Sequence, residues 1–325
     1  MKKNIAVIYG GDSSEFEVSV NSGKQVCQNL DRARYNVYEI LLRGASWAVQ
    51  LDGGTRTAEI NKSDFSATLD GVGIRFDAAF IMIHGTPGEN GLLQAYFDML
   101  HIPYTSCSAF VSALTFNKYA TKCFLRDAGI KMAKERYFRR HETIDFAALA
   151  HELRFPMFVK PNDSGSSCGI TKVKSADGFA RAFAAAFAES DAVIVEEYIA
   201  GRELQQGVLK TGGKTAVLPV TEIITHNEFF DYDAKYKGQS EEITPAAVAP
   251  AVASRLAAHS SLIYDYLGCR GVVRIDYILR ADDIYFLEIN TIPGMSAQSI
   301  VPQQLRAAGI NFTDALTSLV EACEA

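Results

Sequence analysis

The sequence has few cysteines and no long apolar run, which argues against two classes of protein. Its 325 residues include six cysteines that lie far apart, with no C-x-x-C pair and no paired metal-ligand spacing. This pattern is typical of reduced thiols in a cytosol rather than of a disulfide framework. No uncharged apolar stretch reaches the roughly eighteen residues that a membrane-spanning helix needs. The apolar run at residues 5–9 is too short for the core of a signal peptide. We therefore expect a soluble, cytoplasmic protein with no membrane partner.

A strong excess of one charge is also missing. The 32 basic and 38 acidic residues give a net charge of −6, and no block of like charges occurs. A nucleic-acid-binding protein usually carries a basic face, so we expect no nucleic-acid partner. The composition, 48% hydrophobic and 22% charged, supports a buried core and excludes wholesale disorder. The length is typical of two to three domains.

Short apolar runs alternate with helical patterns in the first hundred residues. This alternation predicts an open, mostly parallel α/β sheet. Ligands of such sheets bind beyond the carboxyl ends of the strands, where Gly10-Gly11 and His84-Gly85 fall. We expect strands at residues 4–9, 35–42 and 78–83, and helices at residues 18–30 and 91–100.

The pattern changes after residue 105, and antiparallel strands are expected after residue 200. We therefore expect three lobes, at residues 1–105, 106–200 and 201–325. The second lobe should contain a helix at 109–129, a strand at 155–160, a small-residue loop at 162–169, a helix at 179–189 and a strand at 192–199. The third should contain strands at 203–210, 215–224, 271–279 and 284–290, and a helix at 246–267.

Two glycine-rich segments resemble nucleotide-binding motifs but fail on spacing. Gly213, Lys214 and Thr215 would complete a P-loop only with a glycine at position 208, where the sequence has Val208. This segment also lies between two expected strands, so we expect a hairpin turn. Gly10-Gly11 follows a strand but lacks G-x-G-x-x-G, and no acidic residue ends a second strand about twenty positions later. A nicotinamide-dependent dehydrogenase is therefore disfavoured.

The last two expected strands carry polar side chains on one face. Period-two alternation puts Arg274 and Asp276 on the same face of one strand, and Glu288 and Asn290 on the same face of the next. A three-residue hairpin loop at residues 281–283 sets Asp276 opposite Glu288 and Arg274 opposite Asn290. Side chains opposed in this way begin about 5 Å apart at Cβ.

Two carboxylates and an amide oxygen on one face of the sheet would repel one another unless a cation lay between them. Such hard oxygen ligands bind Mg²⁺ or Mn²⁺, and Mg²⁺ normally shares its shell with substrate phosphates. The alternative is a solvated outer face on which Arg274 and Asp276 form a surface ion pair. The metal site is favoured over this alternative for two reasons. Ile275 points to the opposite face of its strand and needs a buried core there. Asn290 leads directly into a loop, so that a metal would be held at the mouth of this loop.

Lys160 ends an apolar strand and precedes the loop of small residues at 162–169. Glycine and serine in this density let backbone N–H groups approach an anion, and a lysine at the base adds a charge for phosphate. An ordinary exposed loop is the alternative. A second apolar strand ends at Glu196 and Glu197, where an adenine could bind backbone groups. The face of the last two strands that carries Asp276 and Glu288 is called the carboxylate face. Together with it, these features favour a nucleoside triphosphate site.

Six segments, in order along nearly the whole chain, resemble the ATP-grasp superfamily and within it the D-alanine–D-alanine ligases. The segments that carry the resemblance are Gly10-Gly11-Asp12-Ser13-Ser14-Glu15-Phe16-Glu17-Val18-Ser19, His84-Gly85-Thr86-Pro87-Gly88-Glu89-Asn90-Gly91, Lys160-Pro161 with Gly165-Ser166-Ser167-Cys168-Gly169, Asp231-Tyr232-Asp233-Ala234-Lys235-Tyr236, Arg274-Ile275-Asp276, and Glu288-Ile289-Asn290-Thr291-Ile292-Pro293-Gly294-Met295. The sequence departs from the common spelling at Phe16, Cys168 and Glu197, none of which removes a catalytic group.

The resemblance implies roles for the matching residues around the first D-alanine. Glu15 would hold its ammonium group, within a hydrogen-bond network that includes Ser166 and Tyr236. His84 would lie at its carboxylate. The loops at 162–169 and 226–242 would exclude water from the acyl phosphate, which hydrolyses readily.

The resemblance also implies how the nucleotide, metal and second substrate are held. Arg274 and the Gly294 N–H would stabilise the tetrahedral intermediate, and Ser299, with Ile300 beside it, would hold the carboxylate of the second D-alanine. Two Mg²⁺ ions, replaceable by Mn²⁺, would bind Asp276, Glu288 and Asn290. In the ATP site, the phosphates would be contacted by Lys118 and Lys160, and Lys235 would face the transferred phosphate. The adenine and ribose would lie at Glu196, Glu197, Ile199 and Glu203. The site would also include Ser166 and Ser167.

The activity implied is the ATP-dependent joining of two D-alanines for peptidoglycan precursors, by a homodimer. The nearest alternative is a D-alanine–D-lactate ligase, which in this superfamily carries a histidine where this chain has Tyr236. Another ATP-grasp ligase joining a different carboxylate to an amine is a second alternative. A nucleotide-binding sensor without catalysis is the third, and the intact lysines and carboxylates argue against it.

Overall fold

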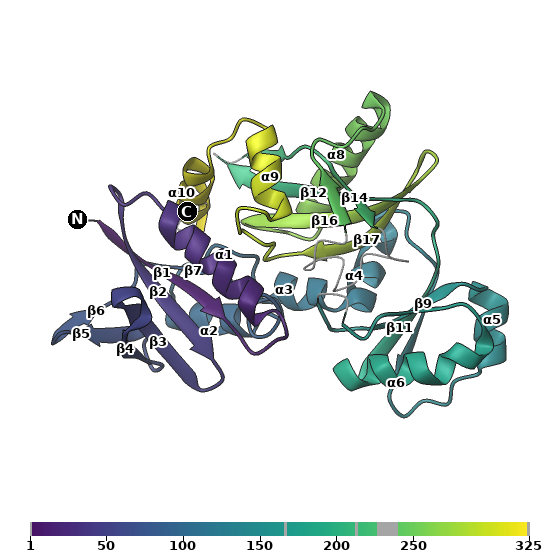
Figure 1. Ribbon diagram of the computed structural model, residues 1–325, viewed down its shortest axis with the longest axis horizontal. Helices are drawn as coiled ribbons and strands as arrows, with labels where there is room; N and C mark the ends of the chain where they lie inside the picture. Colours follow the sequence, from purple (N-terminus) through teal and green to yellow (C-terminus); the bar gives the residue numbers. More distant parts are fainter. Residues whose placement is uncertain (1, 166–167, 212–213, 226–239, 324–325) are drawn as a thin grey trace.

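The computed structural model describes residues 2–165, 168–211, 214–225 and 240–323 (Figure 1). Four residues for which the sequence predicts roles lie outside the described residues: Ser166, Ser167, Lys235 and Tyr236. The described chain folds into three sheets with helices packed on them, which confirms the α/β class. No helix among the described residues is long and apolar enough to cross a membrane.

The first sheet has seven strands and is mixed, not mostly parallel. β1 (Lys3–Gly10) pairs in parallel with β2 (Tyr35–Arg43) and β7 (Ala78–Ile81), as expected. The remaining pairs are antiparallel because the links between their strands are too short for the crossover that a parallel pair needs. These four further strands are β3 (Ser46–Leu51), β4 (Arg56–Asn61), β5 (Ser66–Leu69) and β6 (Val72–Ile74).

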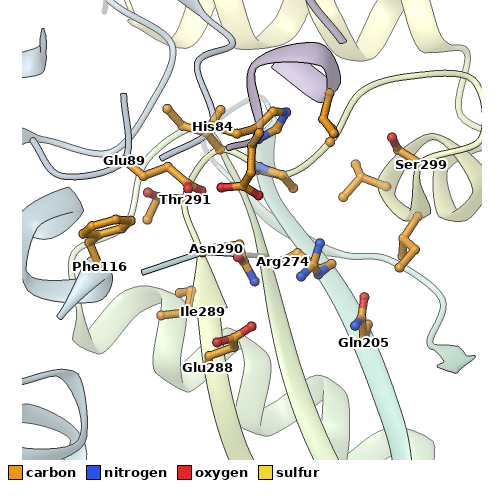
Figure 2. Close-up of a pocket in the computed structure, with 18 of the residues that line it drawn as sticks. His84, Glu89, Phe116, Gln205, Arg274, Glu288, Ile289, Asn290, Thr291 and Ser299 are labelled. Atoms are coloured by element: carbon orange, nitrogen blue, oxygen red, sulfur yellow. The ribbon is translucent and has the colours of Figure 1, made fainter. Parts of the chain in front are cut away.

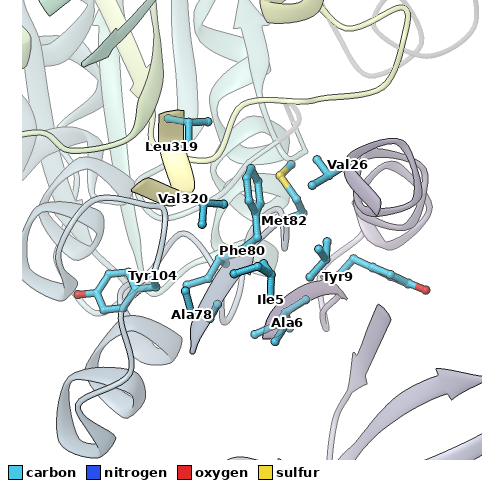
Figure 3. Packing of buried hydrophobic residues seen from close by; sticks show 14 of the residues in the cluster. Ile5, Ala6, Tyr9, Val26, Ala78, Phe80, Met82, Tyr104, Leu319 and Val320 are labelled. Carbon is cyan, nitrogen blue, oxygen red and sulfur yellow. The ribbon is translucent and has the colours of Figure 1, made fainter. Parts of the chain in front are cut away.

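Helices from both ends of the chain bury the parallel strands. Beside the sheet lie α1 (Phe16–Asn29), α2 (Leu92–Leu100) and the C-terminal α10 (Phe312–Cys323). Figure 3 shows Leu319 and Val320 of α10 and Val26 of α1 close to Phe80 of β7. The core of the first lobe therefore includes the C-terminal helix, across the expected boundaries.

The second sheet contains four antiparallel strands in the order β10-β9-β11-β8. Its core lies against α5 (Phe146–Leu153) and α6 (Phe179–Glu189), where Phe179 and Phe183 are buried. The helix at 179–189 is confirmed to the residue, and the strands at 155–160 and 192–199 are confirmed with shifted ends. The strands are β8 (Glu135–Arg139), β9 (Met157–Pro161), β10 (Thr171–Val173) and β11 (Ala192–Glu197).

The third sheet has the order β15-β14-β12-β16-β17, with β13 paired to β12. The expected strand at 215–224 is two strands, β13 and β14, separated at Leu218-Pro219-Val220, because proline has no N–H for a ladder. The helices of this lobe are α8 (Pro250–Tyr266) and α9 (Ile300–Ala307). Its strands are β12 (Arg202–Thr211), β13 (Lys214–Val217), β14 (Thr221–Thr225), β15 (Ser240–Ile243), β16 (Val272–Arg280) and β17 (Asp283–Asn290).

The single helix expected at residues 109–129 is two α-helices, α3 (Ala109–Phe116) and α4 (Lys118–Leu125), followed by a short 3₁₀ turn. Asn117 separates them, with the extended angles φ −88° and ψ 102°. Its side chain accepts the N–H of Ala120 at 2.8 Å, which caps the second helix. The break puts Lys118 at the start of α4.

The register between β16 and β17 is the expected one, but it arises differently. Arg280 pairs with Asp283 around a two-residue turn, not with Ile284 around three residues. A β-bulge next to Tyr277 then shifts the ladder by one residue. Asp276 therefore lies opposite Glu288, and Arg274 opposite Asn290, as predicted.

Candidate active site

A cavity of about 340 Å³ is lined by residues from all three of the expected lobes. Figure 2 shows His84 and Glu89 of the first lobe on one side of it, and Arg274, Glu288 and Asn290 of the third sheet on the other. Lys118 and the loop residue Gly165 also line it. The cavity thus brings together the first-lobe loops, the small-residue loop and the carboxylate face.

Arg274 and Asp276 form a bidentate ion pair on the cavity face of β16. Arg274 Nε and Nη2 donate to the two carboxylate oxygens, both at 2.8 Å. The amide nitrogen of Asn290 lies 3.4 Å from Asp276 Oδ2. Asp276 is only 2% exposed, whereas Glu288 opposite it lines the cavity. The pair is therefore buried, and a solvated surface ion pair is excluded.

The donor set on these two strands fits a hard divalent cation. Asp276 Oδ1 accepts an N–H from Arg274, Oδ2 accepts N–H groups from Arg274 and Asn290, and Glu288 adds a second carboxylate beside them. Among the described residues, no group of three His, Cys, Asp or Glu side chains is arranged to hold a metal. Phosphate oxygens of a nucleotide would therefore have to complete the shell, which is how Mg²⁺ is commonly bound.

Glu196 is buried between two lysines. Lys160 Nζ donates to Glu196 Oε2 at 2.5 Å, and Lys122 forms an ion pair with the other carboxylate oxygen. Burial alone would raise the pKa of Glu196, but the two ammonium groups outweigh it and lower the pKa to about 2. Glu196 was expected at the adenine and ribose; in this arrangement both its oxygens already bind lysines.

Lys118 connects the small-residue loop to the carboxylate face. Its Nζ donates to the carbonyl of Ser164 at 2.6 Å and lies 3.9 Å from Glu288 Oε2. Asn162, fully buried at the start of the loop, accepts the N–H of Lys118 with its carbonyl and that of Tyr119 with its side chain. The start of the loop is thus held against the N-terminus of α4, beside the metal-site candidates.

The first-lobe residues expected at the first substrate meet at one end of the cavity. Glu15 directly precedes α1 and lies so close to the loop that a Cβ on Gly165 would be 2.5 Å from its Oε2. His84 is 5% exposed and its Nε2 lies 3.3 Å from Ser22 Oγ. Burial lowers the pKa of His84, although the charge of Glu15 opposes this, so its neutral form is favoured.

Glu89 is a buried carboxyl group in this cavity to which the sequence assigned no role. Its Oε2 accepts the N–H of Gly85 at 2.8 Å. Burial, followed by the charge of Glu15, raises its pKa to about 8. Glu89 belongs to the same segment as His84, which is the signal that could have found it.

Ser299 and Gly294 are neighbours at the other end of the cavity. Ser299 is the N-cap residue of α9, and its Oγ lies 2.7 Å from Ser296 Oγ. A Cβ on Gly294 would lie 2.7 Å from Ser299 Oγ, so the backbone at 294 closely approaches the hydroxyl. Ile300 follows at the first position of α9 and packs on Ile223. The structure therefore brings these three predicted residues together.

The residues expected at the adenine and ribose lie outside this cavity. Glu197 Oε1 accepts the N–H of Lys134 at 2.9 Å, and Ile199 is buried. Glu203, on β12, accepts the side-chain N–H of Gln205 at 3.3 Å. The sequence analysis did not identify two residues near the site. They are Lys122, which lies one helical turn after Lys118, and Gln205.

Family models match both parts of the chain. The model described as the D-ala D-ala ligase N-terminus matches residues 4–107, and that of the D-ala D-ala ligase C-terminus matches residues 124–321. The D-alanine–D-alanine ligase of Parabacteroides distasonis is 48% identical, covering 99% of this chain and 97% of that protein. The enzyme of the same name from Phocaeicola vulgatus is 46% identical, with 99% of each chain covered.

Solved structures of similar proteins extend the match to the fold. The VanG D-Ala:D-Ser ligase from Enterococcus faecalis superposes with a TM-score of 0.87 at 31% identity, over 99% of each chain. The D-alanine–D-alanine ligase from Bacillus anthracis complexed with ATP gives a TM-score of 0.79 at 28% identity, over 99% of this chain and 97% of that one. The chain thus has the ATP-grasp fold, and it belongs to the D-alanine–D-alanine ligase family.

Proposed function

We propose that this chain joins two molecules of D-alanine into D-alanyl-D-alanine at the expense of ATP, for peptidoglycan precursor synthesis in the cytoplasm. The observation that carries the proposal is that Glu15, Lys118, Arg274 and Glu288, from three lobes, line one cavity. An enzyme that activates one amino acid and delivers a second needs anion-binding, cation-binding and carboxylate groups in one enclosed space. Membership of the family supports the same conclusion.

The first D-alanine would bind at the first-lobe end of the cavity. The carboxylate of Glu15 would receive its ammonium group, in a network with Ser166 and Tyr236. His84, whose neutral form is favoured by burial, would lie at the substrate carboxylate without adding a buried positive charge. These contacts would leave the substrate carboxylate facing the nucleotide.

The lysines would hold the phosphates of ATP and neutralise charge on the transferred group. Lys118 already contacts the loop that would cover these phosphates, and Lys235 would face the transferred phosphoryl group. Lys160 is fixed by Glu196 and keeps two further N–H donors for phosphate oxygens. Backbone N–H groups of the loop, including Ser166 and Ser167, would add uncharged donors.

The adenine and ribose would lie beside the end of β11. The backbone at Glu197 and Ile199 would contact the adenine, and Glu203 would accept ribose hydroxyls. Glu196 would act mainly by fixing the two lysines, since both its oxygens are engaged. These roles follow the family pattern residue by residue.

Asp276, Glu288 and Asn290 would hold two Mg²⁺ ions, or Mn²⁺ in their place. The cations would draw electron density from the phosphate oxygens and lower the barrier to phosphoryl transfer. Arg274, fixed by two hydrogen bonds to Asp276, presents a guanidinium group to the cavity for the negative charge of the tetrahedral intermediate.

The second D-alanine would bind at the opposite end of the cavity. Its carboxylate would lie at the hydroxyl of Ser299 and the backbone beside Ile300, in the first turn of α9, where the helix dipole favours an anion. The N–H of Gly294 would donate to the oxyanion that forms when the amine attacks the acyl phosphate. Phosphate then leaves and the peptide bond remains.

We also propose that the enzyme is a homodimer. The support is an aromatic cluster on α3, α4 and α8, in which Phe110 is 65% exposed. The ring of Phe124 contacts both Phe110, at 6.5 Å between centroids, and Tyr266, at 5.6 Å. Exposed aromatic clusters of this kind are typical of interfaces. Sedimentation equilibrium of the wild type and of Phe110→Asp checks this, and a monomeric wild type contradicts it.

Product analysis tests the proposed activity. The enzyme is incubated with ATP, Mg²⁺, D-alanine and an equal amount of D-lactate or D-serine across pH 6–9, and the products are identified by mass spectrometry. We expect D-alanyl-D-alanine and one phosphate released per dipeptide. A predominant D-alanyl-D-lactate or D-alanyl-D-serine product would assign a different second substrate. Phosphate release that does not depend on D-alanine would contradict the proposal.

A further inference from the structure

Gln205 has a buried acceptor that no described residue uses. Its side chain is 1% exposed, and its amide nitrogen donates to Glu203 Oε1 at 3.3 Å. A carboxylate can only accept hydrogen bonds, so the side of the Gln205 amide that faces Glu203 must be its NH₂ group and not its oxygen. The amide oxygen then faces away from Glu203, and no donor among the described residues reaches it. Leaving such an oxygen unpaired costs free energy, which a ligand with a suitable donor would recover.

Glu242 provides a carboxylate at the same end of the cavity. Its Oε2 accepts a hydrogen bond from Gln303 Nε2 at 2.5 Å, and no described lysine or arginine lies within ion-pair distance of it. Burial raises the pKa of Glu242, and the hydrogen bond from Gln303 and the more distant positive charge of Arg274 oppose this only in part. Both Glu242 and Gln205 line the cavity.

The topology sets these two groups beside the first turn of α9. Glu242 is paired across β14–β15 with Ile223, and Ile223 packs on Ile300. Gln205 is paired with Thr221, two residues before Ile223 on the same strand. Figure 2 shows Gln205 next to Arg274, on the side of the cavity toward Ser299.

We propose that Glu242 and Gln205 receive the amino group of the second amino acid. This inference rests on the proposed function, which places the carboxylate of that substrate at Ser299. An amino acid is a zwitterion, and the cavity offers Ser299 and the N-terminus of α9 for its negative end and Glu242 for its positive end. The ammonium group can donate to Glu242 and Gln205 at once, which gives the amide oxygen its missing donor.

The same pair of acceptors favours an amine over a hydroxyl acid. A hydroxyl group has one hydrogen and no charge, so it can satisfy only one of the two acceptors. Sites built to hydrogen-bond a substrate group discriminate strongly against analogues that lack the donors. Glu242 and Gln205 thus act as specificity-determining residues for dipeptide over depsipeptide formation.

The test compares Glu242→Gln and Gln205→Met with the wild type and with Glu241→Gln. Glu241 is the matched control because it is exposed and adjacent on β15, where alternation turns its side chain to the other face. Initial rates at saturating ATP and Mg²⁺ are measured over a wide range of D-alanine and fitted with a KM for each of the two substrates. The product ratio with equal D-alanine and D-lactate is measured in parallel.

We expect Glu242→Gln to raise the KM for the second D-alanine at least tenfold and Gln205→Met about fivefold, with the KM for ATP and the melting temperature unchanged. The share of depsipeptide should rise in both, and Glu242→Asp should recover part of the loss because it keeps the charge. Unchanged second-substrate KM values and product ratio in both folded variants overturn the inference while the proposed function stands. A wild type that makes no dipeptide overturns the proposed function, and this inference with it.

Discussion

Lys122 and Glu196 form a buried ion pair, although they are 74 residues apart in the sequence. Lys122, on α4, is 2% exposed and also lies 3.4 Å from Glu135 Oε2 on β8. Lys160 of β9 binds the second oxygen of Glu196. The carboxylate of Glu196 on β11 therefore joins α4 to β9, and Lys122 extends the network to β8. The same carboxylate fixes Lys160, which the nucleotide would contact.

Replacing Glu196 with glutamine should strongly destabilise the protein. The change leaves Lys122 buried without its main counter-charge, and removing one partner of a buried pair typically costs about 3–5 kcal/mol. Urea unfolding at pH 7 measures this. The control is Glu152→Gln, which breaks the exposed pair with Arg136 and should cost about 1 kcal/mol or less. Equal losses in the two variants would contradict a stabilising role for the buried pair.

The same variant should change how stability depends on pH. The pKa of Glu196 is lowered from 4.5 to about 2 in the folded protein, so the unfolded chain binds its proton first as the pH falls. Its contribution is therefore complete above pH 4.5 and is lost as the pH falls toward 2. The free energy of unfolding of the wild type should fall more steeply across this window than that of Glu196→Gln. Parallel curves would contradict the lowered pKa.

Replacing Glu288 with glutamine should abolish turnover while the protein stays folded. The change removes the cavity-lining carboxylate of the proposed Mg²⁺ site, keeps the size and shape of the side chain, and weakens the 3.9 Å ion pair with Lys118. We expect kcat to fall at least 100-fold, with a melting temperature within a few degrees of the wild type. Asp283→Asn, at the exposed start of β17, is the control and should retain activity. Near-normal activity of Glu288→Gln would contradict the metal assignment.

Local patterns were sufficient to predict most of the strands and the face that carries the metal-site candidates. Alternation alone puts Arg274 and Asp276 on one face, and the pairing with Asn290 and Glu288 is confirmed. The predicted three-residue loop was nevertheless wrong. The chain forms a two-residue turn and a bulge next to Tyr277, and together these give the same register as the longer loop. Two local errors cancelled, so the correct register was not evidence for the expected turn.

Contacts between distant segments could not be predicted from local patterns. Period and composition say nothing of which core a helix joins, so α10 was assigned to the third lobe although it packs on β7 of the first. The strand end at Glu196 looks the same in sequence whether it meets water or Lys122. Glu89 and Glu242 gained significance only once the fold set them in the cavity.

Glu89→Gln should make the protein relatively more stable at alkaline pH. Burial raises the pKa of Glu89 from 4.5 to about 8, so the folded protein keeps a proton that the unfolded chain has released. The free energy of unfolding should therefore fall as the pH rises from 4.5 to 8 and level off above that. Glutamine cannot ionise and can still accept the N–H of Gly85. Thermal unfolding of both proteins from pH 5 to 9 checks this, and identical slopes would contradict it.

Gly294→Ala should impair binding of the second substrate without destabilising the fold. The added Cβ would lie 2.7 Å from Ser299 Oγ, so the hydroxyl must move out of the position in which it would hold a carboxylate. We expect the KM for the second D-alanine to rise about tenfold and the KM for ATP to stay the same. Gly73→Ala is the control, since its Cβ would meet no atom within 4 Å. If Gly294→Ala instead lowers the melting temperature and leaves the KM unchanged, the glycine serves packing alone and the role of Ser299 at the carboxylate is wrong.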